Sequence, residues 1–101
     1  MNFSFHPEAE QEFYAAINYY ERNKPNLGYD FSIEVVSAIQ NALDYPTAWP
    51  ILEDDVRRCL TNRFPYGILY AIEKDEVFIL AVMHLHRDPD YWKHRHRGEG
   101  F

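Results

Sequence analysis

The chain has 101 residues, of which 47% are hydrophobic and 17% aromatic, and it contains only four glycines. This length fits one domain with one core, and the composition excludes a disordered chain. The lone Cys59 excludes an intramolecular disulfide, and no apolar run is long enough to span a membrane. Since no secretory leader opens the sequence either, we expect a single cytoplasmic domain over residues 1–101.

The formal net charge is -6, with an isoelectric point of about 5.2, and the charge is unevenly distributed. Residues 1–56 carry two Lys or Arg against ten Asp or Glu, whereas residues 57–101 carry eight against six. This separation predicts two faces with different partners. The overall acidity argues against a protein that docks on RNA through a strongly basic surface.

The first half of the chain predicts a short strand followed by two helices. Residues 2–5 alternate polar and aromatic side chains, as in a strand. Pro7 suits the first position of a helix, and that helix should end before the helix-breaking residues 23–26. A second helix should end before Pro46, and the short turn predicts an antiparallel hairpin. The two apolar stripes are Ala9, Phe13, Ala16, Ile17 and Tyr20, then Leu27, Phe31, Val35, Ala38, Ile39, Ala42 and Leu43.

The second half predicts a small sheet. Residues 44–55 read as an ordered connection held by Trp49 and Ile51 and closed by a solvated acidic turn. Strands are expected over 56–61 and 66–73. A third strand, 77–83, is apolar on both faces and should lie in the middle of the sheet.

The end of the chain predicts a short terminal helix over 90–97 and a frayed tail over 98–101. The element order is therefore β-α-α-β-β-β, which favours an α+β domain. In such a domain the N-terminal helical hairpin packs on one face of a small, mostly antiparallel sheet.

Motifs distributed along nearly the whole chain support a more specific identification. They are Phe5-His6-Pro7-Glu8-Ala9, Ala16 with Tyr19-Tyr20, Leu27-Gly28 before Phe31, Glu34-Val35, Trp49-Pro50, Arg57-Arg58, Arg63-Phe64-Pro65-Tyr66-Gly67-Ile68 with Tyr70, Ala81-Val82, His84, and Arg87 followed by Pro89, Tyr91 and Trp92. With these motifs the sequence resembles the RelE/ParE superfamily of toxins from bacterial type II toxin-antitoxin modules. It is most similar to ParE-like members labelled plasmid stabilisation proteins.

The resemblance implies a toxin without a cofactor that inhibits growth and is neutralised by a cognate antitoxin. ParE-like members act on DNA gyrase, whereas RelE-like members cut messenger RNA on the ribosome, and the fold alone does not separate these targets. A third alternative is a non-toxic module that only binds the antitoxin or acts as a co-repressor.

A RelE-like ribonuclease would need proton carriers and cations around the scissile phosphate. The candidate catalytic residues for this alternative are Arg58, Arg63, His84, Arg87 and Tyr91. However, RelE-like members commonly carry an Arg after the Tyr of the third strand, and Gly67 follows Tyr66 here. The missing cation and the acidic composition favour the ParE-like alternative.

A ParE-like inhibitor requires a protein-binding surface rich in arginine and aromatic residues. The candidate partner-binding residues are Arg57, Arg58, Arg63, Arg87, Tyr91, Trp92 and Arg95. Arg57 and Arg58 should face opposite sides of a strand, and Arg58 is expected to face the cleft. We expect Arg58, Arg87 and Tyr91 to meet beside a cleft roofed by the paired helices. The antitoxin should place an acidic stretch over this half and a helix near the hairpin.

Two histidine pairs, His84 with His86 and His94 with His96, suggest metal ligation. No cysteine joins them, and nothing fixes one pair relative to the other. We therefore expect no metal site, and the second pair should belong to a solvated tail.

Overall fold

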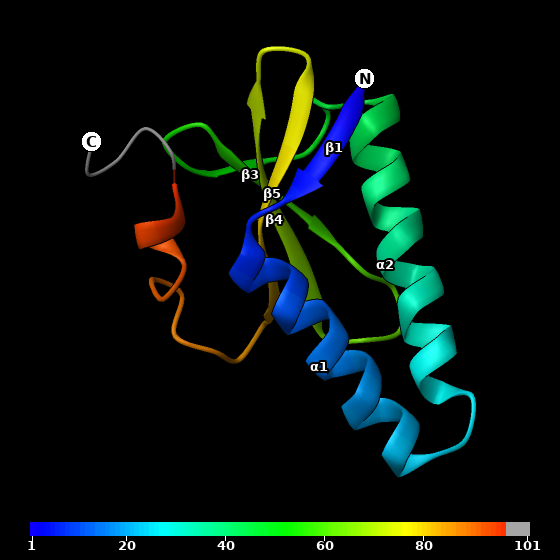
Figure 1. Cartoon of the computed structure of the whole chain (residues 1–101). Helices are drawn as coiled ribbons and strands as arrows, with labels where there is room; N and C mark the ends of the chain where they lie inside the picture. The colour runs from blue at the N-terminus through cyan, green and yellow to red at the C-terminus, as the bar shows by residue number, and fades with distance from the viewer. Residues whose placement is uncertain (97–101) are drawn as a thin grey trace.

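In the computed structural model, which describes residues 1–96, two helices pack on one face of a five-stranded sheet (Figure 1). This arrangement confirms the predicted α+β class with its N-terminal helical hairpin. The elements in chain order are β1 Asn2–Phe5, α1 Pro7–Asn23, α2 Leu27–Asp44, β2 Ile51–Glu53, β3 Val56–Leu60, β4 Tyr66–Glu73, β5 Glu76–His84 and a 3₁₀ turn, η1, Lys93–Arg95.

The strand order across the sheet is β1-β5-β4-β3-β2. β1 runs parallel to β5, with Asn2 opposite Glu76 and Phe5 opposite Ile79, and the other three pairs of strands are antiparallel. The sheet is thus mostly antiparallel, as predicted. The strand predicted for the middle, β5, is instead flanked by β1 and β4, and β4 occupies the centre. β5 is still an interior strand, which accounts for its apolar character on both faces.

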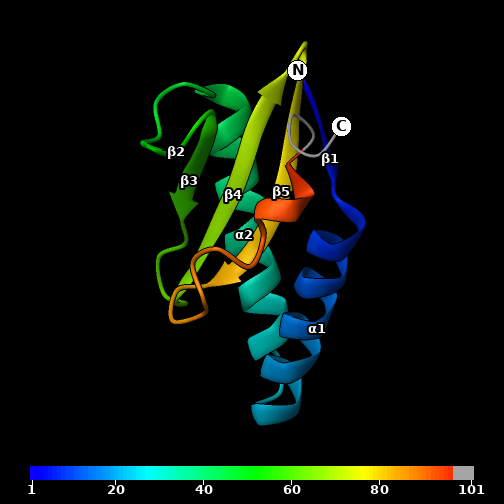
Figure 2. The ribbon, with the colours of Figure 1, turned by 90° about the vertical axis from the view of Figure 1, so that its left-hand side faces the viewer.

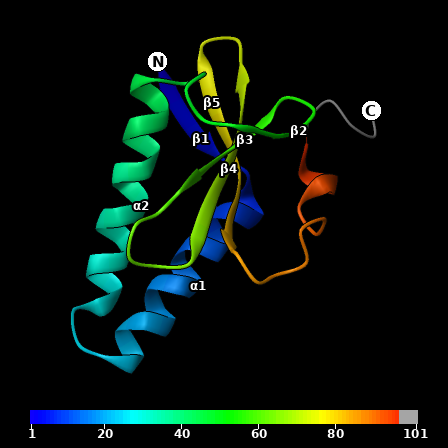
Figure 3. The same ribbon diagram turned by 180° about the vertical axis from the view of Figure 1, so that it is seen from behind.

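The hairpin forms where the sequence supplies both helix boundaries. His6 caps α1 by accepting a hydrogen bond from the Glu8 backbone N–H at 3.1 Å, and Pro7 follows at the first helical position. The helices approach each other closely at Gly28, where a Cβ would lie 2.4 Å from the carbonyl oxygen of Ile17. Any larger residue would therefore push α1 and α2 apart. Figure 3 shows the two helices running antiparallel along one side of the sheet.

Two layers of side chains cover the sheet. The helix-facing layer includes Phe13, Phe31 and the buried Cys59, which behaves as a small core residue. The opposite layer contains Val56, Leu69, Ala71, Phe78, Leu80, Ala81, Met83 and Trp92. Such a bare apolar face would be costly in water, so something has to cover it.

The cover is the C-terminal segment, defined here as residues 85–96. Figure 2 looks onto this face and shows the segment passing in front of β4 and β5, on the side away from the helices. Trp92 is only 2% exposed, and Tyr91 packs beside it. The indole N–H of Trp92 donates to the carbonyl of Pro89 at 2.7 Å, so the buried polar atom has a partner.

Two elements differ from the sequence-based expectation. The predicted connection 44–55 contains the short strand β2, which pairs with β3 through Ile51 opposite Arg57 and Glu53 opposite Val56. The predicted helix 90–97 contracts to the single turn η1, because packing of Trp92 on the sheet replaces a continuous helix. Residue 97 and the predicted tail 98–101 lie outside the described residues. Neither α1 nor α2 combines the length and apolar character that a membrane crossing requires.

Candidate functional site

The C-terminal segment is held to α1 by Glu12. The Glu12 carboxylate accepts two hydrogen bonds from the Arg95 guanidinium, both at 2.9 Å, and one from the Val82 backbone N–H at 3.1 Å. Arg95 also donates to the Leu80 carbonyl at 3.1 Å, and its side chain is only 4% exposed. A bidentate pair of this kind fixes both partners in place. Arg95, a predicted partner-binding residue, is thus buried inside the protein.

Tyr91 lies between two arginines. The Arg87 guanidinium lies 3.8 Å from the centre of the Tyr91 ring, and that of Arg95 lies 4.9 Å from it. Arg87 also forms an ion pair with Glu12 at 3.8 Å. Burial, together with the nearby Glu12 carboxylate, raises the pKa of Tyr91 far above its ordinary value. The phenol therefore stays protonated at neutral pH.

Other polar side chains of the C-terminal segment contact carboxylates of the acidic first half. Lys93 contacts Glu53 at 2.9 Å, His94 contacts Glu8 at 2.9 Å, and His96 contacts Asp55. Residues 93–96 thus contact α1 on one side and β2 with the turn that follows it on the other. The uneven charge distribution of the sequence therefore also serves contacts within the protein.

The contact between Glu8 and His94 leads to a prediction about the pKa of Glu8. The hydrogen bond from His94 is the largest of the effects that lower the pKa of Glu8 below 4.5. A carboxyl whose folded-state pKa is depressed stabilises the fold above its unfolded-state pKa, and this contribution is lost as the pH falls through the folded-state value. We expect His94→Ala to raise the Glu8 pKa toward 4.5. The Glu8 carboxyl can be followed by NMR titration, with Glu10 as the control. An unchanged Glu8 titration in His94→Ala would contradict the assignment.

Arg57 and Arg58 face opposite sides of β3, as the strand alternation predicts. Arg57 lies on the helix-facing side and donates to the carbonyls of Thr47 and Trp49 at 3.1 and 2.7 Å. Arg58 lies on the other side and extends across Gly67, where a Cβ would meet its Cδ at 3.0 Å. Gly67, the residue that replaces the expected cation, therefore makes room for an arginine from the neighbouring strand.

The predicted meeting of Arg58 with Arg87 and Tyr91 beside a cleft roofed by the helices is wrong for Arg58, which lies on the face of the sheet away from the helices. Arg87 and Tyr91 do lie together, as described above. Within residues 1–96, no hydrogen bond, ion pair or cation–π contact joins Arg58 to either of them. Arg63 lies apart from both groups, with its guanidinium 3.7 Å from Asp30 and 4.0 Å from Glu34.

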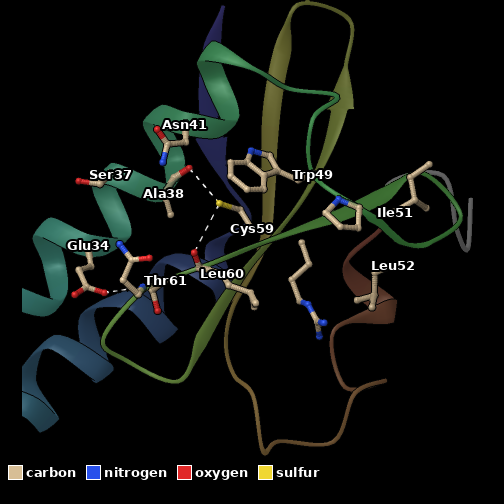
Figure 4. A pocket seen from close by; sticks show the side chains of 13 residues that line it. Glu34, Ser37, Ala38, Asn41, Trp49, Ile51, Leu52, Cys59, Leu60 and Thr61 are labelled. Atoms are coloured by element: carbon tan, nitrogen blue, oxygen red, sulfur yellow. Dashed lines mark hydrogen bonds between the residues drawn. The ribbon is translucent and has the colours of Figure 1, made fainter.

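A groove of about 710 Å³ lies beside β3. We call it the α2–β3 groove. Figure 4 shows side chains of α2 on one side, Trp49, Ile51 and Leu52 on the other, and Cys59 and Leu60 between them. Its lining residues are Glu34, Ser37, Ala38, Asn41, Trp49, Pro50, Ile51, Leu52, Arg58, Cys59, Leu60, Thr61 and Asn62. A groove that combines exposed aliphatic side chains with polar side chains and an arginine is suited to a peptide.

A smaller hollow of about 250 Å³ lies between α1 and the ends of β4 and β5. It is lined in part by Tyr19, Tyr66, His84 and Arg87. The rings of Tyr66 and His84 meet edge to face, with centroids 5.2 Å apart. Burial raises the pKa of Tyr66 to about 12, so its phenol is a hydrogen-bond donor at neutral pH and not a base. This hollow gathers two of the candidate catalytic residues, His84 and Arg87.

The two histidine pairs do not come together at one site. His84 and His86 have ring centroids 5.1 Å apart, whereas His94 and His96 are each directed to a separate carboxylate. Among residues 1–96, no group of three or more His, Cys, Asp or Glu side chains is placed to hold a metal ion.

Sequence reasoning missed Glu12. It appears in the sequence as one of three carboxylates in the first turns of a helix, and only its spacing of four residues from Glu8 marks a shared face. The partner Arg95 is 83 residues away. No local pattern links two positions so far apart in the chain.

Comparison with known proteins identifies the family. Residues 3–89 match the family model of the ParE toxin of the type II toxin-antitoxin system parDE. Among solved structures, the chain resembles one from the chromosomal ParDE toxin-antitoxin system of P. aeruginosa. The two share 16% sequence identity with a TM-score of 0.74, and the alignment covers 85% of this chain and 97% of the other. No curated protein matches the sequence. The chain belongs to the ParE toxin family of type II toxin-antitoxin systems.

Proposed function

We propose that this protein is a growth-inhibiting toxin that binds DNA gyrase and is neutralised by a cognate antitoxin. Membership of the ParE family supports the toxin role and the antitoxin partner. The choice of gyrase over RNA is supported by one observation above all, the pairing of Arg87, Lys93 and Arg95 with carboxylates of the protein itself.

An RNA-binding surface needs cations that are free to contact phosphates. Here Arg95 and Lys93 pair with the protein's own carboxylates, and Arg87 stacks on Tyr91 beside Glu12. The net charge of -6 adds a repulsive background for any nucleic acid. A protein partner is compatible with both features, because protein interfaces rely on aromatic and arginine contacts more than on net charge.

The exposed members of the predicted partner-binding set are the best candidates for contacts with the target. Arg63 and Arg87 have side chains that are 60% and 55% exposed, and one guanidinium nitrogen of each lies within ion-pair distance of a carboxylate, that of Asp30 and that of Glu12. We propose that these two contact gyrase directly. Trp92 and Arg95 are buried, so we assign them the role of holding the surface in shape.

The test is expression of the chain without an antitoxin, followed by an assay of purified protein. We expect filamentous cells with a DNA-damage response, intact transcripts, and inhibition of DNA supercoiling by purified gyrase. Arg87→Ala should weaken the inhibition, while the exposed Arg22→Ala on α1 should not. Growth arrest with cleaved messages, or the absence of any growth effect, would overturn the gyrase target.

The hollow lined by Tyr66, His84 and Arg87 favours a second candidate function, ribosome-dependent cleavage of messenger RNA. A neutral phenol, an imidazole and a guanidinium in one hollow are groups that can move a proton and hold a phosphate. The test is toeprinting of a translated message on purified ribosomes. Cleavage that disappears in His84→Ala would support this function, and an intact message would exclude it.

A further inference from the structure

The α2–β3 groove runs along a strand edge that is not fully paired. Arg58 donates its backbone N–H to the Pro50 carbonyl at 3.2 Å, and Asn62 donates to Glu34 at 3.0 Å. The Thr61 backbone N–H donates to the Tyr66 carbonyl of β4. Because hydrogen-bonded positions alternate along an antiparallel strand, the N–H and carbonyl of the preceding residue, Leu60, point away from β4. Within the described residues, the Leu60 N–H has no acceptor, and its carbonyl meets only the Cys59 thiol at 4.0 Å. A free donor and acceptor on a strand edge can pair with an added strand.

The same groove contains an arginine without a partner. Of the five arginines from residue 57 to residue 96, Arg58 is the one with no hydrogen bond or ion pair from its guanidinium. Its stem is already ordered against Gly67, so binding would cost little side-chain entropy. A half-buried, ordered and unpaired guanidinium is suited to a carboxylate.

Part of the remaining wall is apolar and exposed, and it lies beside the polar side chains of Glu34, Ser37 and Asn41. Ile51, Leu52 and Leu60 are 55%, 40% and 51% exposed, which is high for large aliphatic side chains gathered around one groove. The indole nitrogen of Trp49 is buried and has no acceptor in the described structure. Exposed apolar side chains and a buried indole N–H without an acceptor therefore lie in the same groove.

We propose that an extended segment of the antitoxin adds to β3 at Leu60 and places an Asp or Glu carboxylate on Arg58. Apolar side chains of that segment would cover Ile51 and Leu52. This inference rests on the proposed toxin role and deepens it by assigning the docking mode. An extended segment fits better than a helix, because only an extended backbone offers a free N–H and carbonyl to Leu60.

A second copy of this chain is a poorer occupant of the groove. A two-fold contact between two such grooves would bring the two Arg58 side chains to the same interface, and the Glu34 carboxylate that lines each groove is already engaged by the backbone N–H groups of Asn62 and Arg63. An acidic segment from another protein removes that conflict. The need for a carboxylate opposite Arg58 therefore favours an acidic segment of another protein over a second copy of this chain.

The first experiment measures binding of the cognate antitoxin to purified toxin variants. We expect Arg58→Gln to weaken binding by about 10- to 100-fold, the loss of one charge-assisted hydrogen-bonded pair. Arg22→Gln, which removes an exposed arginine from α1, is the matched control and should bind normally. Arg58→Glu should abolish binding, and one Asp→Arg or Glu→Arg change in the antitoxin should restore it.

The second experiment measures the hydrogen-exchange rate of the Leu60 backbone amide. That amide should exchange rapidly in free toxin and slowly in the complex. Equal binding by wild type and Arg58→Gln, with an unprotected Leu60 amide, would overturn the docking mode and leave the toxin role intact. If wild-type toxin fails to bind the antitoxin at all, the proposed function itself fails, and this inference fails with it.

Discussion

Replacing Glu12 with leucine is expected to lower the free energy of unfolding by about 3–5 kcal/mol, because it leaves a buried guanidinium without its counter-ion. The Arg95 side chain is 4% exposed, and its guanidinium donates two hydrogen bonds of 2.9 Å to the Glu12 carboxylate. The Val82 N–H loses an acceptor at the same time. The measurement is equilibrium unfolding in urea at neutral pH, monitored by tryptophan fluorescence.

A double-mutant cycle separates the pair from its surroundings. In Glu12→Leu/Arg95→Met both charges are gone, so we expect the double variant to be more stable than the sum of the single losses implies. Glu10→Leu, on the exposed side of α1, is the control and should change stability by no more than about 0.5 kcal/mol. Additive losses in the cycle would show that Glu12 and Arg95 do not act as a pair.

Trp92→Ala is expected to destabilise the fold by about 3–5 kcal/mol, the usual cost of emptying a buried tryptophan site. The indole lies in the layer formed with Leu69, Phe78 and Met83, so its removal uncovers the face of the sheet opposite the helices. Thermal unfolding followed by circular dichroism measures the loss. Tyr45→Ala removes a ring that is 67% exposed and should leave the melting temperature nearly unchanged.

The same variant distinguishes a structural role from a binding role for Trp92. If Trp92 supports the fold, any loss of gyrase inhibition by Trp92→Ala should be recovered at low temperature, where the variant is folded. A variant that keeps wild-type stability and still loses inhibition would show that the indole contacts the target.

The helices and long strands could be predicted because their signals are local. The spacing of Ala9, Phe13 and Ala16 identifies the buried face of α1, and Pro7 marks its start. The strand β2 could not be predicted, because three residues are too few for an alternating pattern. The C-terminal helix was overpredicted, since packing of Trp92 overrides the local preference.

The candidate site was predictable only where its residues are neighbours in the chain. Arg87 and Tyr91 are four residues apart, and the structure brings them into contact. Arg58 could be placed on a strand, but its position over Gly67 depends on the register between β3 and β4. Glu12 gave no signal at all, since its role depends on a segment at the other end of the sequence.

The pairing of β1 with β5 bears on biosynthesis. The first strand made, residues 2–5, has its partner in residues 76–79, so the N-terminal strand has to wait until most of the chain has been translated. The ion pair of Glu12 forms later still, because its partner Arg95 lies 83 residues further along the chain. An incomplete nascent chain therefore lacks both the closed sheet and the covered face. The folded surface of residues 1–96 therefore forms only once the segment that contains Arg95 has been made.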